Sequence, residues 1–245
     1  MKYLCDPHII PAVMPGDLTE LADIVGHCAA FSPWLHLDVM DGVFAPNPRW
    51  PFANPHQRSE LEDLANGVSR LPEGISYEVH LMTAAPAELG ALFVRAGCAR
   101  VLAHLEAFGG ADEASAALAQ WKSLGAAEAG LSVRLDTPLS KLEPVIEGCD
   151  VVQVMSIAEI GFQGKPFDER ALSRIEELHA TYPDLMVAAD GGVSEATVEA
   201  LVRAGANRLV VGGAIMKSER PAVAYAHIHE RAMRGCTPLT PEVAV

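Results

Sequence analysis

Residues 34–42 read WLHLDVMDG, an apolar run in which polar or thioether side chains recur at every second position. Residues i and i+2 of a β-strand lie on the same face of a sheet, so His36, Asp38 and Met40 are predicted to point to one side and the aliphatic residues between them to the other. An imidazole and a carboxylate side by side on a strand form half of a transition-metal site. The residues that complete it should lie elsewhere in the chain.

Strand-like and helical stretches alternate along the sequence. Aliphatic and β-branched runs predict strands at 9–14, 34–40, 77–82, 100–106, 131–134, 151–155, 185–190 and 208–211. Apolar residues at helical spacing between these runs predict helices at 18–31, 59–68, 86–96, 112–124, 139–146, 169–178, 195–204 and 220–234.

This alternation, with no linker between units, predicts one closed architecture. Repeated βα units require a parallel sheet with right-handed crossovers, and eight of them close into a (β/α)8 TIM barrel. We therefore expect a single barrel domain over residues 1–245, with a short flexible C-terminal tail from about residue 237. A doubly wound open sheet is the alternative; it is disfavoured because no GxGxxG motif follows the first strand.

The composition excludes several kinds of partner. Half of the 245 residues are hydrophobic, 20% are charged, and the formal net charge of −14 argues against binding to nucleic acid or to anionic membranes. We expect a cytoplasmic protein, because the sequence has neither a long apolar run nor a signal peptide. The five cysteines form no CxxC pair and are expected to be reduced thiols without a catalytic or zinc role: Cys5, Cys28, Cys98, Cys149 and Cys236.

Side chains that can bind metals stand at the ends of several predicted strands. They are His36, Asp38, His80, His104, Glu106 and Asp190. The carboxyl ends of all barrel strands meet at one mouth, so these side chains should lie near one another. Two His and two Asp can hold a divalent transition metal with an open position, whereas a histidine taken alone is more often a hydrogen-bonded core residue.

The two aspartates also suggest proton transfer. Asp38 and Asp190 would lie on opposite sides of the mouth and could serve as base and acid on opposite faces of one carbon. A metal bridging two substrate oxygens would stabilise the enediolate between the two transfers. Met40, Met82 and Met155 end three of the strands; as an alternative to simple core packing, they could exclude water from the reacting carbanion.

Glycine-bearing loops follow the last three predicted strands. Glycine lets backbone N–H groups approach an anion closely, and barrels often bind phosphate with the loops after strands seven and eight. A phosphate could then bind without Lys or Arg, which suits an acidic chain; simple turn glycines are the alternative. The candidate residues are Gly161, Phe162, Gln163, Gly164, Gly191, Gly192, Gly212 and Gly213.

Together these motifs resemble the ribulose-phosphate 3-epimerase family, from Pro11 to about Lys217. Residues 36–47, HLDVMDGVFAPN, resemble the family motif H-x-D-x-M-D-G-x-F-x-P-N. Residues 80–82 match H-L-M, residues 104–107 match H-x-E-A, and residues 137–139 match T-P-L. Residues 190–193 match D-G-G-V, and residues 212–215 resemble G-S-A-I.

The resemblance implies a site and a reaction. His36, Asp38, His80 and Asp190 would bind one divalent metal ion, which could be zinc, iron(II), manganese or cobalt. Asp38 and Asp190 would exchange the proton at C3 of a ketose phosphate, converting D-ribulose 5-phosphate to D-xylulose 5-phosphate. The three methionines and His80 would contact the sugar, and the glycine loops would hold its phosphate. The resemblance also implies a homo-oligomer.

Three departures from the family pattern concern the substrate rather than the reaction. Ala12 stands where the family has a serine, Arg134 stands where asparagine is usual, and the loop at 158–167 is one residue longer than the family motif. They leave open a related hexulose or tetrulose phosphate as the substrate. A non-catalytic sugar-phosphate-binding barrel is the other alternative. Met40 disfavours decarboxylases of this superfamily, which carry lysine at that position.

Overall fold

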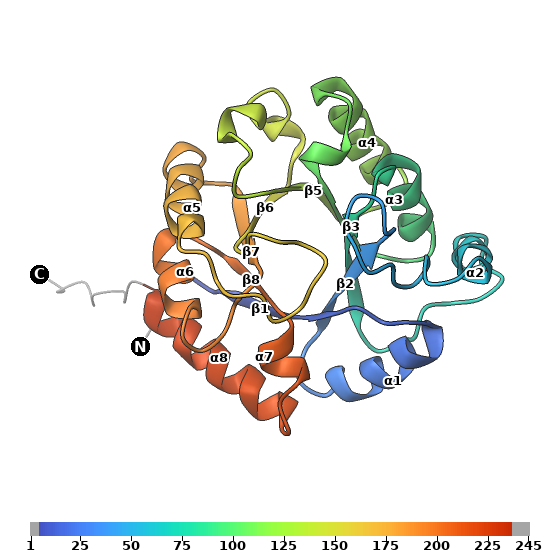
Figure 1. Cartoon of the computed structure of the whole chain (residues 1–245), viewed down its shortest axis with the longest axis horizontal. Helices are drawn as coiled ribbons and strands as arrows, with labels where there is room; N and C mark the ends of the chain where they lie inside the picture. The colour runs from blue at the N-terminus through green and yellow to red at the C-terminus, as the bar shows by residue number, and fades with distance from the viewer. Residues whose placement is uncertain (1–4, 237–245) are drawn as a thin grey trace, which may run out of the picture.

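The computed structural model describes residues 5–236, which form a closed barrel of parallel strands with helices on its outside (Figure 1). Each strand pairs with its neighbours in sequence, and β8 pairs with β1 to close the barrel. The strands are β1 (His8–Val13), β2 (Trp34–Met40), β3 (Ser76–Met82), β4 (Arg100–His104), β5 (Glu128–Val133), β6 (Val151–Met155), β7 (Met186–Asp190) and β8 (Arg208–Val211). The predicted (β/α)8 barrel is confirmed, and the open sheet is excluded.

The helices depart from the prediction at two places. They are α1 (Leu18–Cys28), α2 (His56–Ala65), α3 (Pro86–Arg95), α4 (Ala111–Ser123), α5 (Arg170–Thr181), α6 (Val198–Ala204), α7 (Gly213–Met216) and α8 (Pro221–Gly235). The helix predicted at 139–146 is instead two short 3₁₀ turns, η2 (Leu139–Lys141) and η3 (Ile146–Gly148), because Pro144 lacks the N–H that an α-helix needs there. The short helix α7 was not predicted.

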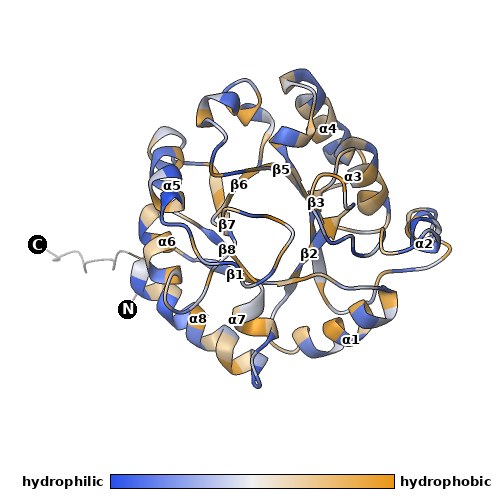
Figure 2. Cartoon of the chain, in the orientation of Figure 1, coloured by the Kyte–Doolittle hydropathy of each residue, from blue (hydrophilic) through white to orange (hydrophobic). Residues whose placement is uncertain are grey.

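Alternation along each strand separates the outer core from the barrel interior. Leu35, Leu37 and Val39 of β2 belong to the large apolar cluster between the strands and the helices. Met40 instead packs with Met82 and Met155 in a separate cluster inside the barrel. Figure 2 shows outer helices such as α1 and α8 carrying both hydrophilic and hydrophobic residues, as expected for helices with one face against the barrel. Within residues 5–236, none of the helices has the length and apolar character needed to cross a bilayer.

A layer of charged side chains crosses the barrel interior near the N-terminal ends of the strands, below the mouth formed by their C-terminal ends. Arg208 of β8, only 1% exposed, donates to Glu78 of β3 (2.8 Å) and to Glu128 of β5 (2.6 Å). Arg100 of β4 lies in register between these two glutamates and pairs with Glu128 at 3.1 Å. Removing one partner from a buried ion pair leaves the other uncompensated, which is far more costly than the pair's net contribution. These four side chains therefore fix β3, β4, β5 and β8 relative to one another.

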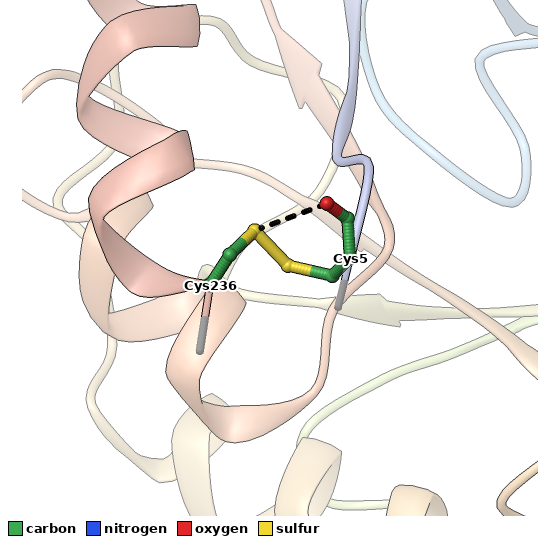
Figure 3. The surroundings of a disulfide bond; sticks show 2 residues. All are labelled: Cys5 and Cys236. Carbon is green, nitrogen blue, oxygen red and sulfur yellow. Dashed lines mark hydrogen bonds between the residues drawn. A yellow bond between two sulfur atoms is a disulfide. The ribbon is translucent and has the colours of Figure 1, made fainter. Parts of the chain in front are cut away.

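The cysteine prediction is wrong for two residues. Cys5, just before β1, and Cys236, just after α8, form a disulfide (Figure 3). They are 231 residues apart in the sequence, but their Cα atoms lie 5.6 Å from each other, within bridging range. Only the folded barrel, which brings its two ends together, makes this pairing evident. The other three cysteines are free and buried. The tail predicted from residue 237 lies outside the described residues.

The buried charged layer gives a stability prediction. Replacing Arg208 with Met should lower the free energy of unfolding by about 3–5 kcal/mol, because Glu78 loses its principal cation in the core. Arg203→Met is the matched control: Arg203 pairs with Glu199 on the surface of α6, and exposed pairs contribute about 0–1 kcal/mol. Chemical denaturation measures both, and a loss below about 1 kcal/mol for Arg208→Met would contradict the role of this layer.

Candidate functional site

Four side chains from three strands converge above the charged layer. His36 and Asp38 lie on β2, His80 lies on β3, and Asp190 is the last residue of β7. Asp38 and His80 are register partners on adjacent strands, which places their side chains next to each other. One potential ligand atom from each of the four residues lies within 4.8 Å of all the others, and all four residues are buried. The structure thus brings together the metal-ligating set predicted from the sequence.

His36 is oriented by a carboxylate behind it. Its Nδ1 lies 2.7 Å from Oε1 of Glu78, so an N–H at this position donates to the glutamate. The other ring nitrogen, Nε2, is buried without a hydrogen-bond partner among the described residues and lies 3.4 Å from Oδ1 of Asp38. A histidine that donates through one nitrogen and directs the other at a carboxylate cluster has the arrangement of a metal ligand. The donor set therefore fits a divalent cation.

His80 is oriented by a relay, a chain of two hydrogen bonds that runs through His104 to Glu106. Its Nε2 lies 3.1 Å from Nε2 of His104, whose Nδ1 lies 3.2 Å from Oε2 of Glu106. Burial lowers the pKa of His104 to about 4, so this ring is neutral and carries one proton. With that proton donated to Glu106, His104 accepts from His80, and Nδ1 of His80 faces Asp38 (3.1 Å) and Asp190 (3.4 Å).

Glu106 is held as a charged acceptor. The predicted strand at 100–106 ends at His104, and Glu106 lies in the short 3₁₀ turn η1 (Leu105–Ala107). Its Oε1 accepts from the Arg134 backbone N–H (2.8 Å) and from the Thr137 hydroxyl. Burial raises the pKa of Glu106, but hydrogen bonds from His104, Thr137 and Arg134 outweigh it and bring the pKa to about 2. His104 and Glu106 thus support a ligand rather than belonging to the ligand set.

Two supporting residues were missed in the sequence. Glu78 holds His36, and Gln153 donates through Nε2 to Oδ2 of Asp190 at 3.1 Å. Each lies two residues before a predicted site residue, Glu78 before His80 and Gln153 before Met155. The period of two would have placed both on the inward face, where a buried polar side chain needs a partner.

A cavity of about 300 Å³ opens from this cluster to the mouth of the barrel. Asp38 and Asp190 line one part of it, beside Met82 and Met155. Met40 is fully buried and packs against these two methionines. The wall also contains all eight residues predicted for phosphate: Gly161, Phe162, Gln163, Gly164, Gly191, Gly192, Gly212 and Gly213. Two lysines missed by sequence reasoning, Lys165 and Lys217, complete this part of the wall.

The long loop between β6 and α5, residues 156–169, runs across the middle of the view in Figure 1. It is tied to β1 because Gln163 Nε2 donates to the carbonyl of Ala12 at 3.1 Å. It is tied to the β2–α2 loop because Asn47 Nδ2 donates to the carbonyl of Gly161, also at 3.1 Å. The mouth is therefore covered from one side. Arg134, the second departure from the family motif, stacks on Phe44 with its guanidinium carbon 4.6 Å from the ring centre.

Comparison with known proteins identifies the family. The model of the ribulose-phosphate 3 epimerase family matches residues 8–216. The chain belongs to the ribulose-phosphate 3-epimerase family. Ribulose-phosphate 3-epimerase of Schizosaccharomyces pombe is 30% identical over 228 residues, covering 92% of this chain and 94% of the yeast protein. The Mycobacterium bovis enzyme of the same name is 32% identical over 232 residues, covering 92% and 93%. The protein is therefore an epimerase, an enzyme of the isomerase class.

Solved structures show that the barrel is shared more widely. A 3-hexulose-6-phosphate synthase superposes with a TM-score of 0.64 at 18% identity, covering 91% of this chain and 99% of that one. KGPDC from Streptococcus mutans gives a TM-score of 0.65 at 14% identity, covering 93% and 98%. At these identities the likeness concerns the fold alone.

In the metal-free site, the His36 ring carries a second proton and is positively charged at neutral pH. Burial disfavours the charged imidazole, but the carboxylates of Asp38 and Glu78 outweigh it and raise the pKa of His36 to about 10. Burial would likewise raise the pKa of Asp38, yet His36 and His80 hold it below its ordinary value. The cluster is therefore a charged network at neutral pH, and a metal ion must displace a proton to bind to His36.

This displacement can be measured. When Zn²⁺ is added to metal-free protein near pH 7.5, at least one proton per bound ion should be released, from His36 and from His80, because Asp38 and other carboxylates outweigh burial and raise the pKa of both rings. Because the raised pKa of His36 is about 10, the release from His36 should disappear as the pH rises above that value, where the ring is already neutral. A pH indicator in weakly buffered solution reports the release. Binding of zinc without it at this near-neutral pH would contradict the assignment.

The relay behind His80 gives a second prediction. His104→Leu removes the acceptor that orients His80 while keeping an apolar side chain of moderate size. The dissociation constant of the metal should rise by about 10–100-fold, as is typical when a partner of a ligating histidine is lost. Competition with a chromogenic chelator measures the constant, and His56→Leu on the exposed start of α2 is the control. Unchanged metal affinity in His104→Leu would argue that the relay has no orienting role.

Proposed function

We propose that this epimerase inverts C3 of a ketose phosphate, interconverting D-ribulose 5-phosphate and D-xylulose 5-phosphate or a close relative of this pair. The observation that carries the proposal is the placement of Asp38 and Asp190, which come from strands β2 and β7 and line one cavity. The names of the yeast and mycobacterial relatives support the pentose phosphate. We further propose that the whole chain acts as one barrel domain and assembles as a homo-oligomer.

We assign one divalent metal ion per chain to His36, Asp38, His80 and Asp190. Two imidazole nitrogens and two carboxylates suit zinc, iron(II), manganese or cobalt. When bound, such an ion supplies Lewis-acid stabilisation of negative charge on the sugar oxygens during proton exchange. The unpartnered Nε2 of His36 supports this assignment, since a buried ring nitrogen without a partner is otherwise costly.

Asp38 and Asp190 are the proposed base and acid. Oδ1 of Asp38 faces His36 and His80, and Oδ2 of Asp190 faces His80 and Gln153. The second oxygen of each carboxylate has no hydrogen bond within residues 5–236. One aspartate can therefore take the C3 proton while the other returns a proton from the opposite face. Because either direction uses the same pair, the roles exchange when the reaction reverses.

The remainder of the cavity suits a sugar phosphate. Met82 and Met155 line the wall beside the aspartates, where thioether side chains exclude water from the reacting carbon. The glycine-bearing loops after β6, β7 and β8 also line the cavity and offer backbone N–H groups to the phosphate. A hexulose or tetrulose phosphate is the second candidate, because Ala12 provides no hydroxyl in the cavity wall.

The two-aspartate assignment predicts the behaviour of conservative variants. Asp38→Asn and Asp190→Asn should each reduce C3 proton exchange by at least ~10², since an amide cannot accept or return the proton at a useful pKa. The measurement is solvent deuterium incorporation at C3 of D-ribulose 5-phosphate by NMR, extended to hexulose and tetrulose phosphates.

Metal content is measured alongside, so that loss of the ion is distinguished from loss of the proton carrier. Asp184→Asn, on the exposed loop before β7, is the control and should retain normal exchange. Near-normal turnover in either active-site variant would contradict the assignment of base and acid. Absence of exchange with every ketose phosphate by the metal-loaded protein would contradict the proposed function itself.

A further inference from the structure

Lys217 lies at the part of the cavity that is lined by the glycine loops. It directly follows α7, and its side chain passes over Gly213: a Cβ at position 213 would lie 3.7 Å from Cδ and 3.8 Å from Cε of the lysine. Its ammonium nitrogen reaches the β6–α5 loop, 3.8 Å from where a Cβ of Gly164 would be. The ammonium group therefore lies between two of the loops that are proposed to hold the phosphate.

Among the described residues, the ammonium group of Lys217 has no counter-ion. Within residues 5–236, no carboxylate lies within 4.0 Å of it. The other cavity lysine differs, because Lys165 pairs with Glu159 and its nitrogen lies 4.5 Å from the centre of the Phe162 ring. Of the two cations in this wall, Lys217 is thus the one whose charge is available to a ligand.

The negative charge of the protein favours a cation at the place where a phosphate would bind. The chain carries a formal net charge of −14. A phosphate ester approaching the cavity is repelled by this excess of negative charge, and a cation in the cavity wall offsets part of the repulsion. Position 213, where the family motif has serine, is glycine here, so the side chain at this position supplies no hydroxyl donor.

We propose that Lys217 binds the substrate phosphate with a charge-assisted hydrogen bond from its side chain. The proposal rests on the proposed function, because it assigns the glycine loops to a phosphate. The methylene stem of Lys217 lies across the turn at Gly213, and the lysine side chain lines the cavity. The lysine would then select phosphorylated ketoses over free ones at a distance from the reacting carbon.

The location of Lys217 predicts which kinetic constant changes. An interaction with a remote, non-reacting group that is equally strong in the ground state and the transition state affects KM and leaves kcat unchanged. Lys217→Met should therefore raise KM for the ketose phosphate about tenfold or more, with kcat within about twofold of wild type. Lys217→Arg keeps the charge and should retain most of the affinity. Lys141→Met, which removes an exposed lysine outside this cavity, is the matched control.

A second readout uses inorganic phosphate as the probe and needs no turnover. Calorimetric titration of the metal-loaded protein should give a dissociation constant for phosphate that is about tenfold or more higher in Lys217→Met than in Lys141→Met. Equal phosphate affinity in these two variants, or a kcat effect without a KM effect, would overturn the role of Lys217. If wild type exchanges no ketose phosphate but still binds phosphate through Lys217, the proposed reaction fails while this inference stands.

Discussion

The structure depends on the hydrogen bonds of one buried carboxylate, Glu78. Its two oxygens serve different parts of the molecule: one accepts from Arg208 in the charged layer, and the other accepts from the ring of His36. The same side chain thus helps to fix the strands and orients a proposed metal ligand. A buried charge of this kind is tolerated only when its partners are complete, so the geometry of the site is set by the same network that positions the barrel strands.

The two histidines of the cluster are oriented from opposite sides by equivalent means. His36 donates to a glutamate directly, whereas His80 reaches one through His104. In both cases a carboxylate determines which ring nitrogen carries the proton, and the other nitrogen faces the aspartates. The orientation of the two histidines therefore depends on Glu78 inside the barrel and on His104 and Glu106 at the end of β4 and in the turn after it.

Much of this arrangement could be predicted from the sequence, because period-two alternation fixes both the strand and its inward face. The bounds of β2, β6 and β8 coincide with the predicted runs, and the four clustered residues follow from the strand ends. The prediction of a helix at 139–146 was wrong because the spacing of apolar residues carries no information on the missing N–H of Pro144. Contacts between distant segments, such as Cys5 with Cys236 or Lys217 with the loop at Gly164, leave no local pattern in the sequence.

The disulfide between Cys5 and Cys236 links the segment before β1 covalently to the end of α8. A closed sheet must still begin and end somewhere, and here the first and last strands meet where β1 pairs with β8. Because the disulfide joins Cys5 to Cys236, residues 5–236 form a covalent ring. If β1 or α8 detaches, the two segments stay tethered, which restricts the conformations of the unfolded chain. A single cut in any outer loop of this ring also leaves one connected molecule, so proteolytic nicking need not release a fragment.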